Sequence, residues 1–395
     1  MMKPILTKAT LLVTLAAAAY AARIYLDSSH ITAKEQRNTP AAETVKSGNT
    51  DIPVNRDDKN TLPLFRTWET FGKKDGLPSD KITSVRIGRD RVWVGTDKGL
   101  ALYRNGEWTV ITTEKGLSHN YILGIDVNEK TGEVWIATMA GLNRWSAGKI
   151  EVYSQFNSGL ANDVVYAVLA DDQYVWTATA AGASRYDTYT DQWSIFDTEN
   201  APMHEPWTYG IADGGDKIYI AAWGGGVIEY FKNSGRFRVH RDPDHQMEID
   251  LYPDDGIVHD VITGASYQNG VLWVGSYFGM SRYDGTHWQS YFEEDSGLAS
   301  NFINFIKAHE SVVYICTDKG LSTFDGTRWA TYYSNELDAG GEIRIREGDQ
   351  TTKLSTSSSL PDNYIWAMDI RGEEIWVATA NGVSRSRSST ETARL

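Results

Sequence analysis

The fold of this chain is decided by one stretch, residues 76–103, which reads GLPSDKITSVRIGRDRVWVGTDKGLALY. It holds a Gly-Leu turn, a short apolar strand, an aromatic strand that begins at Trp93, and a further strand that opens at Gly99. The same order of marks recurs up to about Arg385. A fixed period of about 40 residues is typical of repeat proteins in which each unit is one small sheet.

Both marks occur seven times. The turn begins at Gly76, Gly116, Gly159, Gly256, Gly297 and Ser359, with a divergent copy at 202–206. The aromatic strand begins at Trp93, Trp135, Trp176, Tyr219, Trp273, Tyr314 and Trp376. One such sheet cannot bury both of its faces alone, and a radial arrangement packs each sheet on two neighbours. The sequence therefore predicts an all-β fold, a seven-bladed β-propeller of four-stranded antiparallel sheets.

The ring is expected to close through its first strand. The fourth strand of a unit carries two large apolar residues three positions apart, as in Trp329 and Tyr332. The last unit ends near Arg385 without such a strand, whereas Trp68 and Phe71 precede the first full unit. We therefore expect the N-terminal strand to complete the last blade, which leaves no broken edge.

The ends of the chain differ in composition from the repeats. Residues 1–22 contain two lysines and then an apolar run, which predicts a signal peptide or, if residues 5–26 stay attached, an N-terminal membrane anchor. Residues 23–63 are polar and predict a disordered linker, 64–388 form the propeller, and 389–395 are a disordered tail. The protein is expected to be periplasmic, secreted or at the cell surface.

Charge and cysteine content exclude some classes of function. The formal net charge of −14 repels phosphate backbones, so nucleic acid is not an expected partner. The single cysteine, Cys316, excludes an internal disulfide. It occupies the small position held by Gly or Ala in the other aromatic strands, so we expect an inert buried thiol.

The repeats GLPSD…VWVGTDKGLALY and GLASNF…YICTDKGLSTF resemble the two-component-regulator propeller repeat. The resemblance covers about 320 residues in seven copies. The family occurs in large sensor proteins that detect ligands outside the cell. The resemblance implies a stand-alone binding or scaffold module, whose signal would pass through a separate partner because this chain shows no kinase sequence.

Two units are lengthened by insertions between their fourth strand and the next first strand. The first, at 240–255, gathers carboxylates that could hold Ca²⁺ through oxygen ligands, namely Asp242, Asp244, Glu248 and Asp250. A solvated acidic loop is the alternative. The second, at 336–358, is rich in Gly, Ser and Thr, and is interpreted as flexible padding or as a flap over a ligand.

Histidines fall in the turns of three units. His119, His204 and His259 could face one channel mouth, and Glu205 lies beside His204. Imidazoles and a carboxylate at one mouth could bind a ligand or a metal, or act as acid and base. This favours a second hypothesis, a metal-assisted lyase or hydrolase at the channel mouth, although fold analogy alone carries no activity.

Bulky aromatic residues mark the divergent fourth unit. Trp207, Tyr209 and Trp223 lie at the expected ligand face, where rings could stack on sugars. The alternative is that they pack where two prolines have changed the turn. The first hypothesis is therefore a non-catalytic exported propeller that binds a glycan, peptide or protein partner as a sensor, and the third is an assembly scaffold alone.

One Asx residue recurs near the end of most turns and looks like a row of ligands. Because such a side chain can bond its own turn, we interpret these residues as structural. They are Asp80, Asn120, Asp163, Asp260, Asn301 and Asn363.

Overall fold

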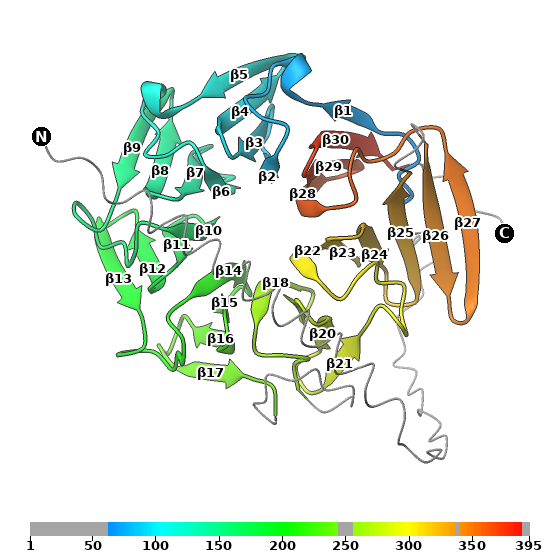
Figure 1. Cartoon of the computed structure of the whole chain (residues 1–395). Helices are drawn as coiled ribbons and strands as arrows, with labels where there is room; N and C mark the ends of the chain where they lie inside the picture. The colour runs from blue at the N-terminus through cyan, green and yellow to red at the C-terminus, as the bar shows by residue number, and fades with distance from the viewer. Residues whose placement is uncertain (1–61, 244–255, 336–339, 389–395) are drawn as a thin grey trace, which may run out of the picture. The chain divides into compact units, whose positions relative to one another are not determined.

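The computed structural model describes residues 62–243, 256–335 and 340–388, and these form seven antiparallel sheets in a ring (Figure 1). Helical structure within these ranges is limited to two 3-10 turns, Lys73–Asp75 and Thr113–Lys115. The prediction of an all-β, seven-bladed propeller is confirmed. Within the described part of the chain, no helix is both long and apolar enough to cross a membrane.

The first four blades each contain four strands, ordered from the inside of the ring outwards. Blade 1 consists of β2 (Ile82–Ile87), β3 (Val92–Thr96), β4 (Gly99–Arg104) and β5 (Glu107–Ile111). Blade 2 consists of β6 (Ile122–Val127), β7 (Val134–Thr138), β8 (Gly141–Ser146) and β9 (Lys149–Tyr153). Blade 3 consists of β10 (Val165–Ala170), β11 (Tyr174–Thr179), β12 (Gly182–Asp187) and β13 (Gln192–Phe196). Blade 4 consists of β14 (Thr208–Asp213), β15 (Lys217–Ala222), β16 (Gly226–Phe231) and β17 (Phe237–His240).

The remaining three blades include one that is wider and one that joins the two ends of the repeat region. Blade 5 consists of β18 (Ile262–Gln268), β19 (Val271–Ser276), β20 (Met280–Tyr283) and β21 (Trp288–Tyr291). Blade 6 consists of β22 (Ile303–His309), β23 (Val312–Thr317), β24 (Leu321–Phe324), β25 (Arg328–Ser334), β26 (Gly341–Glu347) and β27 (Gln350–Thr356). Blade 7 consists of β28 (Ile365–Arg371), β29 (Glu374–Thr379), β30 (Gly382–Arg387) and β1 (Glu69–Phe71).

The ring closes as the sequence predicted, because β1 is the outer strand of blade 7 (Figure 1). It pairs antiparallel with β30, and Phe71 stands opposite Val383. The Phe71 ring stacks on Trp376 of β29 with centroids 5.7 Å apart and an interplanar angle of 15°. Before β1, Phe65 is fully buried and packs on Tyr332 of blade 6 at 6.1 Å, so the entering chain also contacts a second blade.

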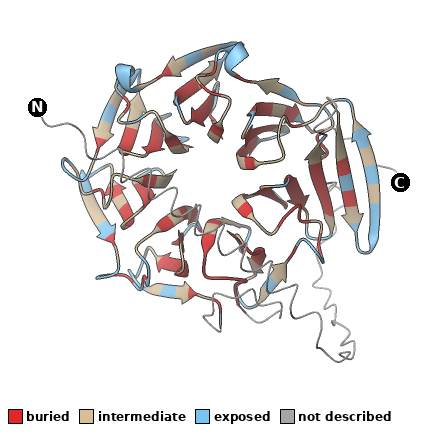
Figure 2. Ribbon diagram, viewed as in Figure 1, coloured by how far each residue is buried: buried red, intermediate tan, exposed pale blue. Residues whose placement is uncertain are grey.

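The core lies between the blades, and Figure 2 shows the buried residues concentrated in the inner strands. Large and small residues alternate on one face of the second strands. Trp93 is 1% exposed, and Gly95 two positions later shares its face. A Cβ at Gly95 would lie 2.7 Å from Ile122 Cγ2 of the next blade. The small residue therefore lets the neighbouring sheet approach, as interdigitated packing requires.

The recurring Asx side chains close their turns, which confirms their structural interpretation. Asp80 Oδ1 accepts a hydrogen bond from the Lys73 amide at 2.7 Å, in the segment that leaves the previous fourth strand. The other five do the same at equivalent positions: Asn120 with Thr113, Asp163 with Gln155, Asp260 with Asp242, Asn301 with Glu293 and Asn363 with Ser334. Each bond satisfies a backbone donor inside the connection between two blades.

The second insertion adds two strands to blade 6, which corrects its interpretation as padding or as a ligand flap. β26 pairs with β25, and β27 pairs with β26, so both strands lie at the outer edge of the blade (Figure 1). Ile343 and Ile345 alternate with charged residues and are 2% and 9% exposed. This apolar alternation favours a half-buried strand over a loose loop. Residues 336–339 lie outside the described residues.

Candidate ligand site in the central cavity

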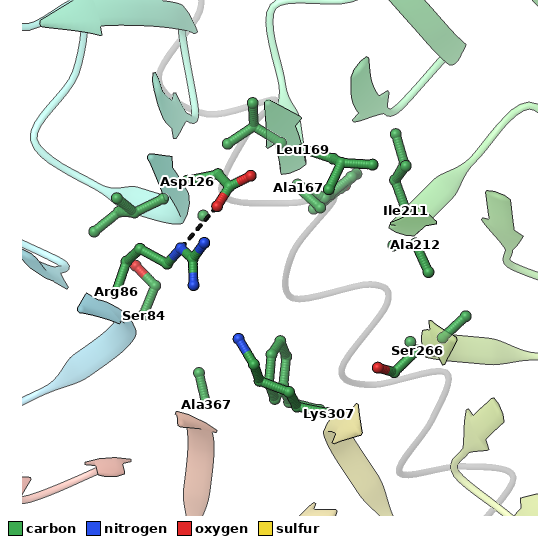
Figure 3. A pocket seen from close by; sticks show the side chains of 18 of the residues that line it. Ser84, Arg86, Asp126, Ala167, Leu169, Ile211, Ala212, Ser266, Lys307 and Ala367 are labelled. Atoms are coloured by element: carbon green, nitrogen blue, oxygen red, sulfur yellow. Dashed lines mark hydrogen bonds and ion pairs between the residues drawn. The ribbon is translucent and has the colours of Figure 1, made fainter. Parts of the chain in front are cut away.

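The innermost strands of all seven blades surround a cavity of about 1010 Å³ (Figure 3). Each of these strands follows the connection from the previous blade. All seven run in the same direction along the cavity wall. We call the end at which they begin the upper mouth, and the end at which they finish the lower mouth. Midway, the lining is mostly small, because Gly124, Ala167, Gly210, Gly264 and Ala367 take the third strand position.

Aromatic side chains gather at the upper mouth, at the starts of first strands and in the turns after second strands. We call them the aromatic collar: Tyr121, Tyr166, Tyr209, Trp223, Tyr277, Phe302, Tyr364 and Trp366. Between blades 3 and 6 the rings contact one another in series. The centroid distances are 4.4 Å for Tyr166–Tyr209, 5.1 Å for Tyr209–Trp223, 5.4 Å for Trp223–Tyr277 and 3.8 Å for Tyr277–Phe302.

Lys81 completes the collar on the side of blades 7, 1 and 2. Its Nζ lies 5.6 Å from the Tyr121 ring centroid and 5.4 Å from that of Trp366, which is the geometry of a cation–π contact. Among the described residues no carboxylate forms an ion pair with this ammonium group. Lys81 is therefore a cation held at the mouth by rings, and its N–H donors can reach a ligand.

Four of the collar phenols, those of Tyr166, Tyr209, Tyr277 and Tyr364, remain protonated at neutral pH and above. Burial raises the pKa of Tyr166, Tyr209 and Tyr277, and it raises the pKa of Tyr364 to about 12. Neighbouring phenols add to the effect, since Tyr277 raises the pKa of Tyr209 and Tyr364 raises that of Tyr277. The hydroxyl groups therefore keep their protons and can donate hydrogen bonds.

At least three buried polar atoms at this end have no hydrogen-bond partner among the described residues, and two of them are relevant to the collar. One is Nε1 of Trp366, a donor on a side chain that lines the cavity. The other is Oδ1 of Asp318, an acceptor in the turn after β23, whose charge raises the pKa of Tyr364. Buried polar atoms are nearly always paired in folded proteins, so a ligand that supplies one acceptor and one donor would be stabilised here.

The lower half of the cavity is crossed by ion pairs. Arg86 Nε contacts Asp126 at 2.8 Å, and Figure 3 shows these two side chains joined with Lys307 pointing into the same space. Arg86 also lies 3.1 Å from Asp369, which Lys307 contacts at 2.6 Å. Burial opposes ionisation of Asp369, but Lys307 and Arg86 outweigh it and lower its pKa.

A further pair lies next to these at the lower mouth. Arg371 of blade 7 reaches Glu129 of blade 2 at 3.0 Å, so it links two blades that flank blade 1. We call Arg86, Asp126, Glu129, Lys307, Asp369 and Arg371 the ionic network. Its charges already satisfy one another, so a ligand would have to displace internal partners at this end. The upper mouth is therefore the better candidate for ligand entry.

The structure places two of the three predicted aromatic residues in the collar. Tyr209 lines the cavity, and Trp223 contacts both Tyr209 and Tyr277. Trp207 is half-buried one residue before β14, the position that Lys81 and Tyr121 hold in blades 1 and 2. Its carbonyl accepts the Trp223 amide at 2.9 Å, so it also supports the backbone of the collar.

The predicted histidines and Glu205 are not among the residues that line the central cavity. His119 and His259 each accept, through Nδ1, the amide two residues ahead at 2.9 Å. Ser79, Asn162, Ser300 and Asp362 make the same bond in other blades, so this is a turn function. His259 is 0% exposed, whereas His119, His204 and Glu205 are exposed. An acid–base role for His204, Glu205 and His259 stays a prediction.

The predicted calcium loop lies mostly outside the described residues. Asp242 is 3% exposed and its amide donates to Asp260, whereas Asp244, Glu248 and Asp250 fall in the gap at 244–255. Within the described ranges no group of three or more His, Cys, Asp or Glu residues could hold a metal ion. Calcium binding by the full loop stays a prediction.

The sequence reasoning missed Lys81 and most of the collar. The signal was nonetheless present, because an aromatic residue stands just before or at the second position of the first strand in several copies. Tyr121, Tyr166, Phe302, Tyr364 and Trp366 all follow this pattern. The ionic network was also missed. Its members come from different blades, and an alignment of the repeats does not show which side chains of different blades contact one another.

A scan against protein-family profiles and a sequence search of curated proteins both gave no match. Solved structures are similar in fold. Two are extracellular domains assigned to hybrid two-component systems of B. thetaiotaomicron. Both are 17% identical to this chain over 82% of its length, with TM-scores of 0.61 and 0.62. The chain spans only 42% and 40% of those two structures.

A third similar structure is virginiamycin B lyase from Staphylococcus aureus. It is 11% identical, with a TM-score of 0.57 over 81% of this chain and 98% of the lyase. At these identities the likeness shows only that the propeller fold is shared with extracellular domains of two-component systems and with an enzyme. The fold alone therefore does not choose between binding and catalysis.

Proposed function

We propose that this chain is an exported, non-catalytic binding module that captures a ligand at the upper mouth of its central cavity, as a sensor or scaffold. The observation that carries the proposal is the aromatic collar with Lys81. It combines ring surface, protonated phenols and a cation that has no carboxylate partner among the described residues. Apolar walls with a few converging polar groups are the usual composition of a ligand site.

A glycan is the ligand class that these groups favour over a peptide or protein partner. Sugars present C–H faces to rings and hydroxyls to polar atoms. The collar offers both, through Tyr209 and Trp223 on one side and the unpartnered Nε1 of Trp366 on the other. The fold likeness to extracellular domains of two-component systems supports the proposal of an exported location and a sensor role, with the signal passing through a partner.

Two further parts of the proposal concern the ends of the chain and the acidic loop. Residues 1–22 would direct export as a cleaved signal peptide, or residues 5–26 would hold the protein at the inner membrane. Calcium bound at 240–255 would be held by carboxylates in the connection between blades 4 and 5. Both are tested directly, by N-terminal sequencing of the exported protein and by metal analysis of the purified chain.

The test of the binding site is a glycan panel read by immobilised binding and by tryptophan fluorescence. Lys81→Met removes the ammonium group but keeps an apolar stem, and Tyr209→Ala with Trp223→Ala removes two collar rings. We expect at least a tenfold loss of affinity for each, since charged hydrogen bonds and stacked rings contribute about 1 to 3 kcal/mol. Melting curves verify that each variant is folded.

The matched control is Tyr189→Ala, because Tyr189 is an aromatic residue that is 67% exposed in the turn between β12 and β13. Its loss should leave glycan affinity unchanged. Undiminished binding in the folded Lys81 and collar variants would remove this site. Binding of a protein partner but of no glycan on the panel would overturn the glycan assignment and favour the scaffold role.

A further inference from the structure

A second cavity lies where blade 7 meets blade 1, at the ends of the strands remote from the collar. Its volume is about 420 Å³. Its walls come from the turn at 88–91, the end of β4 at Arg104, the turn at 371–374 and the end of β30 at Arg387. Four separate segments therefore converge on one small space that the proposed glycan site does not use.

The lining of this cavity is rich in arginine. We call it the arginine pocket, and its charged members are Arg89, Arg91, Arg104, Arg371, Arg387, Asp90, Glu373 and Glu374. Five guanidinium groups face three carboxylates, and Arg371 pairs with Glu129 outside the lining, so the remaining excess is one positive charge. The whole chain carries a formal charge of −14, so this concentration of positive charge runs against the composition of the protein.

Internal pairing leaves part of that positive charge uncompensated. Asp90 is shared, since it lies 2.7 Å from both Arg91 and Arg104. Arg89 donates to the carbonyl of Glu129 and has no carboxylate partner among the described residues. One carboxylate thus serves two guanidinium groups, and a third guanidinium has only a neutral acceptor.

Several of these groups are also open to solvent. The Arg104 side chain is 51% exposed and that of Arg387 is 76% exposed, although Arg387 pairs with Glu374 at 3.1 Å. A guanidinium presents a planar fork of N–H donors that matches the oxygens of phosphate, sulfate and carboxylate groups. A cluster of such forks around a small cavity is suited to a compact anion with several oxygens.

We propose that the arginine pocket binds a phosphate or sulfate group of a ligand, independently of the collar at the other end of the ring. Arg89 and Arg104 are the primary contacts, because neither has a carboxylate of its own. Glu373 lines the same cavity and opposes an anion there. The site would give the module a second ligand class, in which a phosphate ester or a sulfate ester is the recognised group.

The experiment titrates the full chain with inorganic pyrophosphate and, separately, inorganic sulfate by calorimetry at low ionic strength. We expect saturable binding of at least one anion, weakened about tenfold or more in Arg89→Gln with Arg104→Gln, because each lost charged hydrogen bond has that order of effect. Glu373→Gln should tighten binding severalfold. Added salt should weaken it, since the groups are partly exposed.

The matched control is Lys130→Gln with Arg236→Gln, which removes the same number of positive charges from exposed turns of blades 2 and 4. Affinity should stay within twofold there, which separates a pocket from general attraction. Tighter binding of pyrophosphate would indicate that the recognised group is a phosphate ester, and tighter binding of sulfate would indicate a sulfate ester. Absence of saturable binding by both anions, or equal loss in the control, would overturn the proposal, whereas glycan binding at the collar would be unaffected.

Discussion

Arg86 of blade 1 and Asp369 of blade 7 form an ion pair, with Nη1 and Oδ2 3.1 Å apart, at the joint where the ring closes. The same Oδ2 accepts the amide of Ile87 at 2.7 Å, and Oδ1 accepts Nζ of Lys307 of blade 6 at 2.6 Å. One carboxylate thus joins three blades at the cavity wall. On the outer side of the same joint, β1 pairs with β30. The closure is therefore stabilised at two places, by ion pairs at the innermost strand of blade 7 and by strand pairing at its outermost strand.

Asp369→Asn should destabilise the propeller by about 3 kcal/mol, the usual range for breaking a buried ion pair from one side. Asp369 is 1% exposed, so Lys307 would lose its carboxylate partner, and Arg86 would keep only Asp126 and Glu129. Urea denaturation measures the change. Asp172→Asn is the control, because the Asp172–Lys130 pair is largely exposed and should contribute less than about 1 kcal/mol. Equal effects in the two variants would contradict the role of the buried pair.

Phe71→Ala should cost about 3 kcal/mol, as expected for an aromatic residue removed from a packed cluster. Phe71 contacts Tyr103 at 5.4 Å, Trp108 at 5.7 Å and Trp376 at 5.7 Å, so it links blade 7 to blade 1. Thermal melting gives the change. Phe156→Ala is the matched control, since Phe156 is 96% exposed and its loss should leave the melting temperature unchanged.

Glu229 should make stability depend on acid pH. Burial opposes its ionisation, but hydrogen bonds from His240 and Lys217 outweigh burial and lower its pKa to about 2, against an ordinary 4.5. The folded state therefore favours the ionised form. The resulting stability is complete above the ordinary pKa and is lost as the pH falls from about 4.5 towards 2.

Glu229→Gln tests this directly. At neutral pH we expect a loss of about 2 kcal/mol, the scale of a buried charged hydrogen bond. Between the two pKa values the free energy of unfolding of the variant should change less steeply with pH than that of the parent chain. Denaturation curves at a series of pH values give both slopes, and parallel slopes would show that Glu229 does not titrate in this window.

Cys316 should not react with thiol reagents while the protein is folded. It is 0% exposed on β23, and burial raises the pKa of its thiol well above the ordinary value. Both effects suppress the thiolate that would attack a reagent. A colorimetric thiol assay should find no fast reaction in buffer and one thiol in guanidinium chloride. Rapid labelling of the native chain would mean that blade 6 opens locally.

The architecture could be predicted because its determinants repeat. The pairing of β1 with β30 followed from Trp68 and Phe71 carrying the fourth-strand pattern ahead of the first unit. The Asx residues were also correctly interpreted as structural, since their bond recurs with the turn, although it reaches the segment after the previous fourth strand. The hairpin β26–β27 was misread, because its two isoleucines are few among Ser, Thr and charged residues.

The candidate site was harder to predict because it depends on which blades face one another. Tyr209 and Trp223 were identified from the divergence of their unit, and both lie in the collar. His119 and His259 stood out as unusual residues. Their Nδ1 atoms accept the same turn hydrogen bond that the side-chain oxygens of Ser79 and Asn162 accept in other blades. Pairs such as Arg371 with Glu129 join distant positions in the sequence, and no repeat period defines such contacts.

The antiparallel pairing of the first and last strands has a mechanical consequence. Glu69 stands opposite Arg385 and Phe71 opposite Val383, so the chain enters and leaves blade 7 at the same end of the two strands. A pull applied to both ends of the described region would load the hydrogen bonds one after another, as in unzipping, instead of all together in shear. If the protein is attached at one end alone, no force acts across this strand pair. If its two ends are attached to different partners, a force between the partners would separate β1 from β30 and open blade 7 first.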